Sequence, residues 1–248
     1  MRSLGRSALL PLEGLWAPGA AMDVAGSRRA VVALASLLAL VTGLGAAALP
    51  RLLALLAATL GGGAPSAAGS HADALRAGLV RYLVADRLLP PLPLLGAAVL
   101  VAAVASPVLA TRRVAARAVW GVLAVGAAPL VLQRVGELAV VWTTPAAGLV
   151  AGDVTGLAAR FNVGVGGILA AAGFSPGVAL GAAVEAANAT GLWVVSLWGW
   201  GLARLDHDAS RAGTRLPAWP FALSLAAYAG AYAAWVVLFP WYLMLVMG

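Results

Sequence analysis

Uncharged apolar stretches of about twenty residues or more limit what this chain can fold into. Ala30–Leu49, Leu92–Ala110 and Pro217–Met247 contain no Asp, Glu, Lys or Arg. A helix of ~20 residues crosses the ~30 Å of hydrocarbon in a bilayer, whereas barrel strands would alternate over ~10 residues. Because 62% of the chain is hydrophobic and 10% is charged, we predict an all-α, polytopic transmembrane helical bundle.

The predicted bundle is a single membrane domain, residues 30–248, preceded by a cytoplasmic N-terminal segment, residues 1–29. About five spans are expected, at residues 30–49, 92–110, 114–133, 184–203 and 217–247. Interfacial helices are expected in the outer loops, mainly at Ala72–Leu89, whose charges are not confined to one face. Proline has no backbone N–H, so Pro50 is expected to kink or end the first helix.

Three features of this organisation have two interpretations each. Arg28–Arg29, the first span and the small residues Ala46–Ala48 also fit a cleaved secretory signal. Translation can begin at Met1 or at Met22. Val163–Ala172 is apolar but too short to cross, so it is either a re-entrant piece or a buried cap.

The arginines predict the orientation. All sixteen basic residues are arginine, which, with the abundant Ala and Gly, is typical of a GC-rich bacterial genome. With five spans, ten arginines fall on one side, five fall on the other and Arg134 lies at a span end. Arginine-rich loops stay in the cytoplasm, so we expect an inner-membrane protein with a cytoplasmic N-terminus and an external C-terminus. These arginines suit anionic lipid of the bilayer rather than nucleic acid.

Few residues suggest catalysis or a cofactor. The chain has no cysteine, and His71 and His207 lie in predicted polar loops. Asp206–Asp208 is expected to be part of a solvated loop in which the aspartates offset Arg204 and Arg211. We therefore predict no catalytic set, no metal site, no cofactor and no enzyme activity.

Three charges lie near predicted span ends. Arg134 follows Val114 by twenty residues, or ~30 Å of helix, which places it at the outer, hydrated membrane surface with Glu137 and Glu185. Arg134 and Glu137 have the i,i+3 spacing of a helical ion pair, and Arg134 can instead pair with Glu185 between two spans. A proton or ion relay is the alternative role.

Small residues recur at every fourth position in the last two predicted spans. Small residues let helix backbones approach closely in lipid, so Gly191 and Gly230 are predicted to pack the fourth and fifth spans together. A homo-oligomer contact is the alternative. The two stripes are Ala183, Ala187 and Gly191, and Ala222, Ala226, Gly230 and Ala234.

Two stretches resemble the bacterial branch of the Yip-domain family, which is named for eukaryotic relatives that interact with Ypt/Rab GTPases. Arg117–Leu138 (RAVWGVLAVGAAPLVLQRVGEL) is an arginine-led span with A-x-P near its end. Ala187–Leu205 (ANATGLWVVSLWGWGLARL) has a polar entry, including Asn188, and resembles the family's FxLWsxxLxxxG span. The matching positions are Trp193, Leu197, Trp198 and Gly201. Trp200 and the charged residues after the span depart from the pattern.

The resemblance implies a non-enzymatic, membrane-organising or partner-binding protein. The bacterial branch has no well-defined activity, and the Rab partner is not carried over. A small transporter or permease-like subunit is one alternative, and an accessory subunit of a larger membrane complex is another. Expected partners are the lipid bilayer, other membrane proteins or a second copy of the chain.

Overall fold

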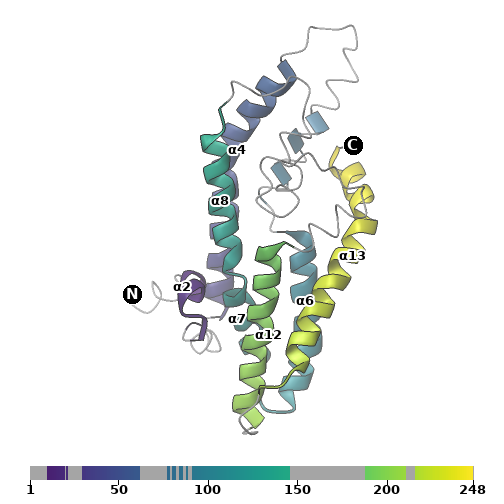
Figure 1. The fold of residues 1–248 in the computed structure, drawn as a ribbon. Helices are drawn as coiled ribbons and strands as arrows, with labels where there is room; N and C mark the ends of the chain where they lie inside the picture. The colour runs from purple at the N-terminus through teal and green to yellow at the C-terminus, as the bar shows by residue number, and fades with distance from the viewer. Residues whose placement is uncertain are drawn as a thin grey trace. The chain divides into compact units, whose positions relative to one another are not determined.

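The computed structural model describes residues 10–19, 21, 30–61, 77–78, 80–81, 84–85, 88, 91–145, 188–210 and 216–247. These residues form helices joined by turns, with no strand among them, so the all-α prediction is confirmed (Figure 1). The helices are α2 (Leu10–Trp16), α4 (Ala30–Gly61), α6 (Leu92–Ala110), α7 (Ala116–Gly126), α8 (Pro129–Thr143), α12 (Ala189–Ser210) and α13 (Trp219–Met247).

Four stretches of the described chain are long and apolar enough to cross a membrane, as expected for a polytopic membrane protein. They are Val31–Thr59, Leu92–Ala110, Ala116–Thr143 and Trp219–Tyr242. They correspond to four of the five predicted spans, and two of them extend well beyond the predicted ends at residues 49 and 133.

The fourth predicted span is the exception. Helix α12 has 22 residues, about 33 Å at 1.5 Å per residue, but it is not among the four apolar stretches. Its glycines, its tryptophans and the charges in its last two turns make it more polar than the others. It occupies Ala189–Ser210 rather than 184–203, and the predicted residues 184–187 lie outside the described residues.

Three prolines lie inside helices that remain continuous. Helix α4 runs through Pro50, α6 through Pro107 and α13 through Pro240. Of the two expectations for Pro50, a kink or a helix end, the helix end is therefore wrong. Side chains on both sides of Pro50, Ala48 and Leu52, are buried in one cluster, and this packing outweighs the lost hydrogen bond. Pro129 instead begins a new helix, because α7 ends at Gly126.

The chain divides into two compact units. The first unit covers residues 1–40, 91–132 and 189–234, and so contains α2, α6, α7, α12 and the first half of α13. Helix α7 is its centre and packs against α2, α6 and α12. All residues from Gly121 to Val131 are buried, as expected for a helix that is covered on all sides.

Close backbone approaches join α13 to the other helices of the first unit. Gly191 of α12 faces the Tyr228 ring and hydroxyl, and Gly199 faces Phe221. A Cβ at Gly96 of α6 would lie 3.8 Å from the Ala231 Cβ. The first half of α13 therefore lies along both α12 and α6.

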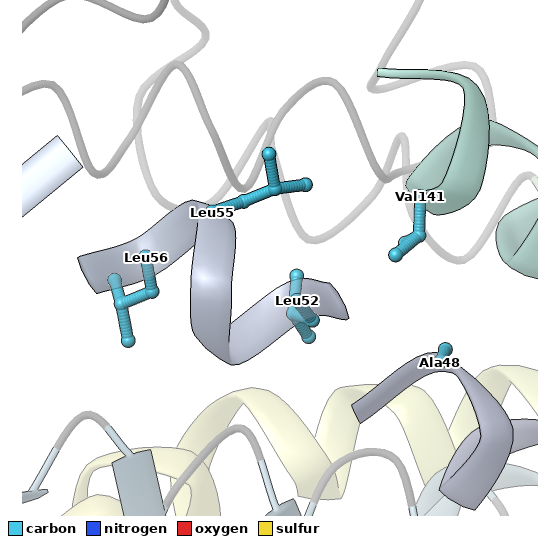
Figure 2. Packing of buried hydrophobic residues seen from close by; sticks show 5 residues of the cluster. All are labelled: Ala48, Leu52, Leu55, Leu56 and Val141. Atoms are coloured by element: carbon cyan, nitrogen blue, oxygen red, sulfur yellow. The ribbon is translucent and has the colours of Figure 1, made fainter. Parts of the chain in front are cut away.

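The second unit, residues 41–90, 133–188 and 235–248, has its own apolar cluster. Ala48, Leu52, Leu55 and Leu56 form one face of α4 and pack with Val141 of α8 (Figure 2). The described residues between 77 and 88, part of the predicted interfacial helix, are helical. The predicted re-entrant or cap segment, Val163–Ala172, lies outside the described residues.

Candidate functional site

The apolar stretch Ala116–Thr143 is interrupted near its middle. Pro129 has no N–H with which to bond Val125 O, so the α-helical ladder cannot continue through it. The Ala128 N–H instead bonds Val125 O at 3.1 Å, and Ala127 and Ala128 form a turn between α7 and α8. Broken helices at membrane depth are tolerated where protein covers the irregular backbone.

Trp198 of α12 covers this break. Its side chain is 1% exposed, and its Nε1–H donates to Leu123 O at 2.8 Å. Gly126 allows this approach, because a Cβ there would come within 2.5 Å of Trp198 Cδ1. The indole therefore shields the backbone beside the interruption and gives Leu123 O a second donor, in addition to the Ala127 N–H.

A second side of the break is covered by α2. Gly14 lies so close to α7 that a Cβ would meet Val125 Cγ1 at 2.8 Å and Val125 O at 2.9 Å. Gly14 itself is buried. Part of the predicted cytoplasmic N-terminal segment is thus packed into the first unit.

Polar side chains follow the break by one turn. On α8, Arg134 Nη1 lies 2.7 Å from Glu137 Oε2, and Gln133 Nε2 donates to Glu137 Oε1 at 3.0 Å. The predicted i,i+3 pair is confirmed. The predicted hydrated environment is wrong, since Arg134 is 7% and Glu137 6% exposed. Helix α8 continues beyond Glu137 to Thr143, so the pair does not lie at a helix end.

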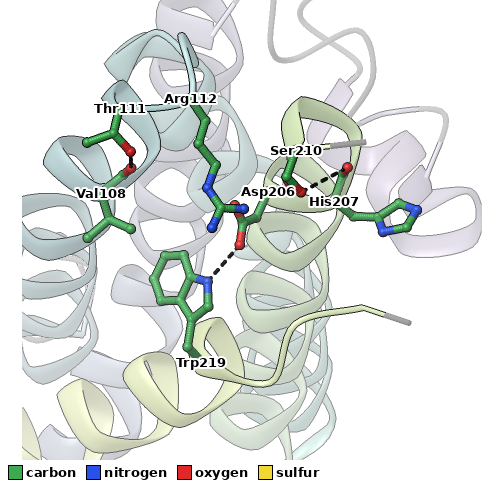
Figure 3. Close-up of polar contacts among 7 residues, drawn as sticks. All are labelled: Val108, Thr111, Arg112, Asp206, His207, Ser210 and Trp219. Atoms are coloured by element: carbon green, nitrogen blue, oxygen red, sulfur yellow. Dashed lines mark hydrogen bonds and ion pairs between the residues drawn. The ribbon is translucent and has the colours of Figure 1, made fainter. Parts of the chain in front are cut away.

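Asp206 forms a third polar cluster, at one end of the first unit. Its carboxylate accepts a hydrogen bond from Trp219 Nε1 at 2.8 Å and forms an ion pair with Arg112 (Figure 3). Asp206 is 1% exposed, so the predicted solvated loop is wrong at this residue. Helix α12 continues past Asp206 to Ser210. The buried carboxylate of Asp206 has its counter-charge in Arg112 of the α6–α7 turn and its hydrogen-bond donor in Trp219 at the start of α13.

Arg113 shapes the α6–α7 turn. Its φ is +64°, its N–H bonds Ala110 O, and the next N–H, from Val114, bonds Leu109 O. These two bonds form the Schellman motif that usually places glycine at the left-handed position. This turn directs Arg112 toward Asp206, while Arg113 and Arg117 remain exposed.

The small-residue stripes have opposite outcomes. Gly191 contacts Tyr228 of α13, so it packs the two helices as predicted. Gly230 has nothing within 4 Å of its added Cβ, and the prediction that it packs α13 against α12 is wrong. Helix α13 buries a neighbouring face, with Ser224, Ala227, Tyr228 and Ala231. The larger side chain of Tyr228 fits against a glycine, and this pairing rotates the Gly230 stripe outward.

The remaining predicted residues lie apart from these clusters. Trp193 is 44% exposed on the outer side of α12. Asn188 directly precedes α12 and is half-buried. Glu185, and with it the proposed Arg134–Glu185 pair, lies outside the described residues. Ala183 and Ala187 of the small-residue stripe are also outside them.

Three residues that form buried or part-buried polar contacts were not identified from the sequence: Arg112, Trp219 and Arg51. Arg51 Nη2 donates to Thr144 O at 2.8 Å, which satisfies a carbonyl just beyond the α8 C-terminus. Arg112 and Asp206 lie on the same side of the membrane in the predicted topology, and this shared side is a signal for their pairing. Nothing in the local sequence indicates which carbonyl Arg51 reaches.

The described residues contain no group of three or more His, Cys, Asp or Glu side chains that could hold a metal ion. Comparison with known proteins adds no relative: no family model, no curated protein and no solved structure matches this chain.

Proposed function

We propose that this chain is a non-enzymatic component of the bacterial inner membrane that binds a membrane-spanning helix of a partner. The observation that carries the proposal is the exposed small-residue face of α13, formed by Ala222, Ala226, Gly230 and Ala234. Because small residues drive helix association in lipid, a face left outside its own bundle suits an intermolecular contact. The function agrees with the resemblance to bacterial Yip-domain proteins, and also with an accessory subunit.

A single-cysteine crosslinking experiment tests this contact. The native chain has no cysteine, so Ala226→Cys can carry one photoactivatable crosslinker on the proposed face. Gly43→Cys is the matched control, because Gly43 of α4 is also exposed with nothing within 4 Å of an added Cβ. After irradiation in membranes, mass spectrometry should identify a peptide adduct at position 226 and none at position 43.

A bulky substitution then tests the face itself. Gly230→Leu should remove the adduct at position 226 while leaving thermal unfolding unchanged, because the added side chain enters open space. Gly43→Leu should leave the adduct intact. Lipid adducts alone at position 226, or equal protein adducts at both positions, would exclude a partner helix on this face.

A small transporter is the second candidate, favoured by the α7–α8 break and the buried Arg134–Glu137 pair that follows it. Interrupted helices and intramembrane charges are common features of transport sites. Proteoliposomes with an internal pH-sensitive dye test whether the protein transports protons. Dissipation of an imposed proton gradient by the native protein, lost in Glu137→Gln with unchanged unfolding, would favour transport over partner binding.

The proposed topology has a cytoplasmic N-terminus and an external C-terminus, with α12 as a fifth crossing. The length of α12 and the Arg112–Asp206 pair support it, because the pair joins the α6–α7 turn to the α12 C-terminus. Reporter fusions after Gly213 and Gly248 should report cytoplasm and exterior, respectively. If both fusions report the same compartment, α13 does not cross the membrane. An exterior report after Gly213 would mean either that α12 does not cross or that the orientation is reversed, and either outcome would contradict the proposed topology.

A further inference from the structure

The α6–α7 turn lies at a membrane face. Two apolar stretches that can cross a bilayer, Leu92–Ala110 and Ala116–Thr143, are joined by residues 111–115 only. So short a joint keeps both helix ends at one surface of the bilayer. The position of the turn therefore follows from the two helices it joins and does not depend on which compartment it faces.

Two arginines at this joint have no carboxylate partner among the described residues. Arg112 is already paired with Asp206, and Arg204 lies 4.0 Å from Asp208. These are the two carboxylates that the structure describes at this end of the first unit. Arg113 and Arg117 are both exposed, so the turn has an uncompensated double positive charge.

The surroundings of these arginines match the boundary between headgroups and acyl chains. Trp120 lies one helical turn after Arg117 and is 36% exposed. Tryptophan rings of this kind gather at the headgroup level of membranes. On the α6 side, Val104 and Val108 are 47% and 41% exposed and present apolar surface directly before the basic turn.

We propose that Arg113, Arg117 and Trp120 form a binding site for the phosphate headgroup of an anionic phospholipid. Guanidinium groups bind phosphate oxygens through charge-assisted hydrogen bonds, and the indole and valines contact the glycerol and upper acyl region. The Schellman hydrogen bonds hold the Arg113 backbone in its left-handed conformation. The Arg113 guanidinium group therefore extends from a turn of defined geometry. A soluble phosphate has no acyl chains, so it cannot make the contacts of the lipid with the indole and the valines.

Native mass spectrometry of the detergent-purified full chain provides the test. The probes are dioleoyl phosphatidylglycerol, dioleoyl phosphatidylcholine and glycerol phosphate, each titrated to measure the affinity of the first bound molecule. Phosphatidylglycerol should bind tightest. A basic residue at an anionic surface contributes about a five-fold change in affinity, so Arg113→Gln/Arg117→Gln should weaken its binding by roughly 25-fold. Phosphatidylcholine has a phosphate as well, but its choline cation offsets the charge, so it should bind more weakly than phosphatidylglycerol and lose less affinity in this variant.

Two control variants separate this site from net charge and from misfolding. Arg81→Gln removes an exposed arginine of the second unit and should leave phosphatidylglycerol affinity within about two-fold. Arg113→Lys/Arg117→Lys keeps both charges and should retain most of the affinity. Equal weakening by Arg81→Gln, unchanged affinity in the double glutamine variant, or equally tight glycerol phosphate binding would each overturn the proposal.

Discussion

The Trp198→Phe substitution tests whether the α7–α8 break depends on the indole that covers it. The change keeps an aromatic ring in the buried position but removes the Nε1–H that donates to Leu123 O at 2.8 Å. It also removes the outer part of the indole beside Gly126. Trp193→Phe on the same helix is the matched control, because Trp193 is 44% exposed.

The expected cost has two parts. Loss of the hydrogen bond removes about 0.6–1.5 kcal/mol. Leu123 O still accepts the Ala127 N–H at 3.1 Å, so no buried carbonyl is left without a donor and the larger penalty for an orphaned group does not apply. A void of a few tens of Å³, at about 24 cal/mol per Å³, adds about 1 kcal/mol. Trp198→Phe should therefore destabilise the fold by ~1.5–2.5 kcal/mol.

Unfolding in mixed micelles with increasing dodecyl sulfate, followed by circular dichroism, measures this difference. Trp193→Phe should change the unfolding free energy by less than ~0.5 kcal/mol, as surface substitutions do. If Trp198→Phe unfolds with the same midpoint and slope as Trp193→Phe, the indole contributes nothing at the break, and its role as a cover is refuted.

Three further changes have expected outcomes in the same unfolding assay. Gly191→Ala should cost ~1–3 kcal/mol, because its Cβ would overlap the Tyr228 hydroxyl; a neutral result would mean that α13 can move away freely. Arg134→Ala and Glu137→Ala should each cost up to ~3–5 kcal/mol as members of a buried pair, and the double variant should cost less than their sum; additivity would show that the charges are not coupled. Arg113→Val should cost ~1–2 kcal/mol, because a β-branched residue is strained at a φ of +64°, whereas Arg113→Gly should be neutral or stabilising; equal stability of both would contradict the left-handed turn.

Helix positions were predictable because they depend on local properties of the chain. An uncharged apolar stretch of sufficient length must satisfy its backbone groups internally as a helix in lipid. The helices Leu92–Ala110 and Trp219–Met247 accordingly begin and end within two residues of their predicted spans. The i,i+3 pair of Arg134 and Glu137 is equally local, since both residues belong to one helix.

Contacts between helices were less predictable, because small residues occur on several faces of α13. Gly230 and Tyr228 are two residues apart, about 200° around the helix, so burying one face exposes the other. Periodicity identifies each face but does not choose between them. The choice is made by shape: the Tyr228 side chain fits over Gly191, where α12 has no Cβ.

By itself, the sequence determined that this is an all-α membrane protein, where most of its helices lie, and that Arg112 and Asp206 belong to one side. Tertiary structure decided which charges are buried. Asp206 looks like a residue of a polar loop until Arg112 and Trp219, distant in sequence, supply its counter-charge and hydrogen bond. Burial of a charge depends on partners that only the packed helices bring together, and the same holds for Trp198, whose role exists only because α7 breaks beside it.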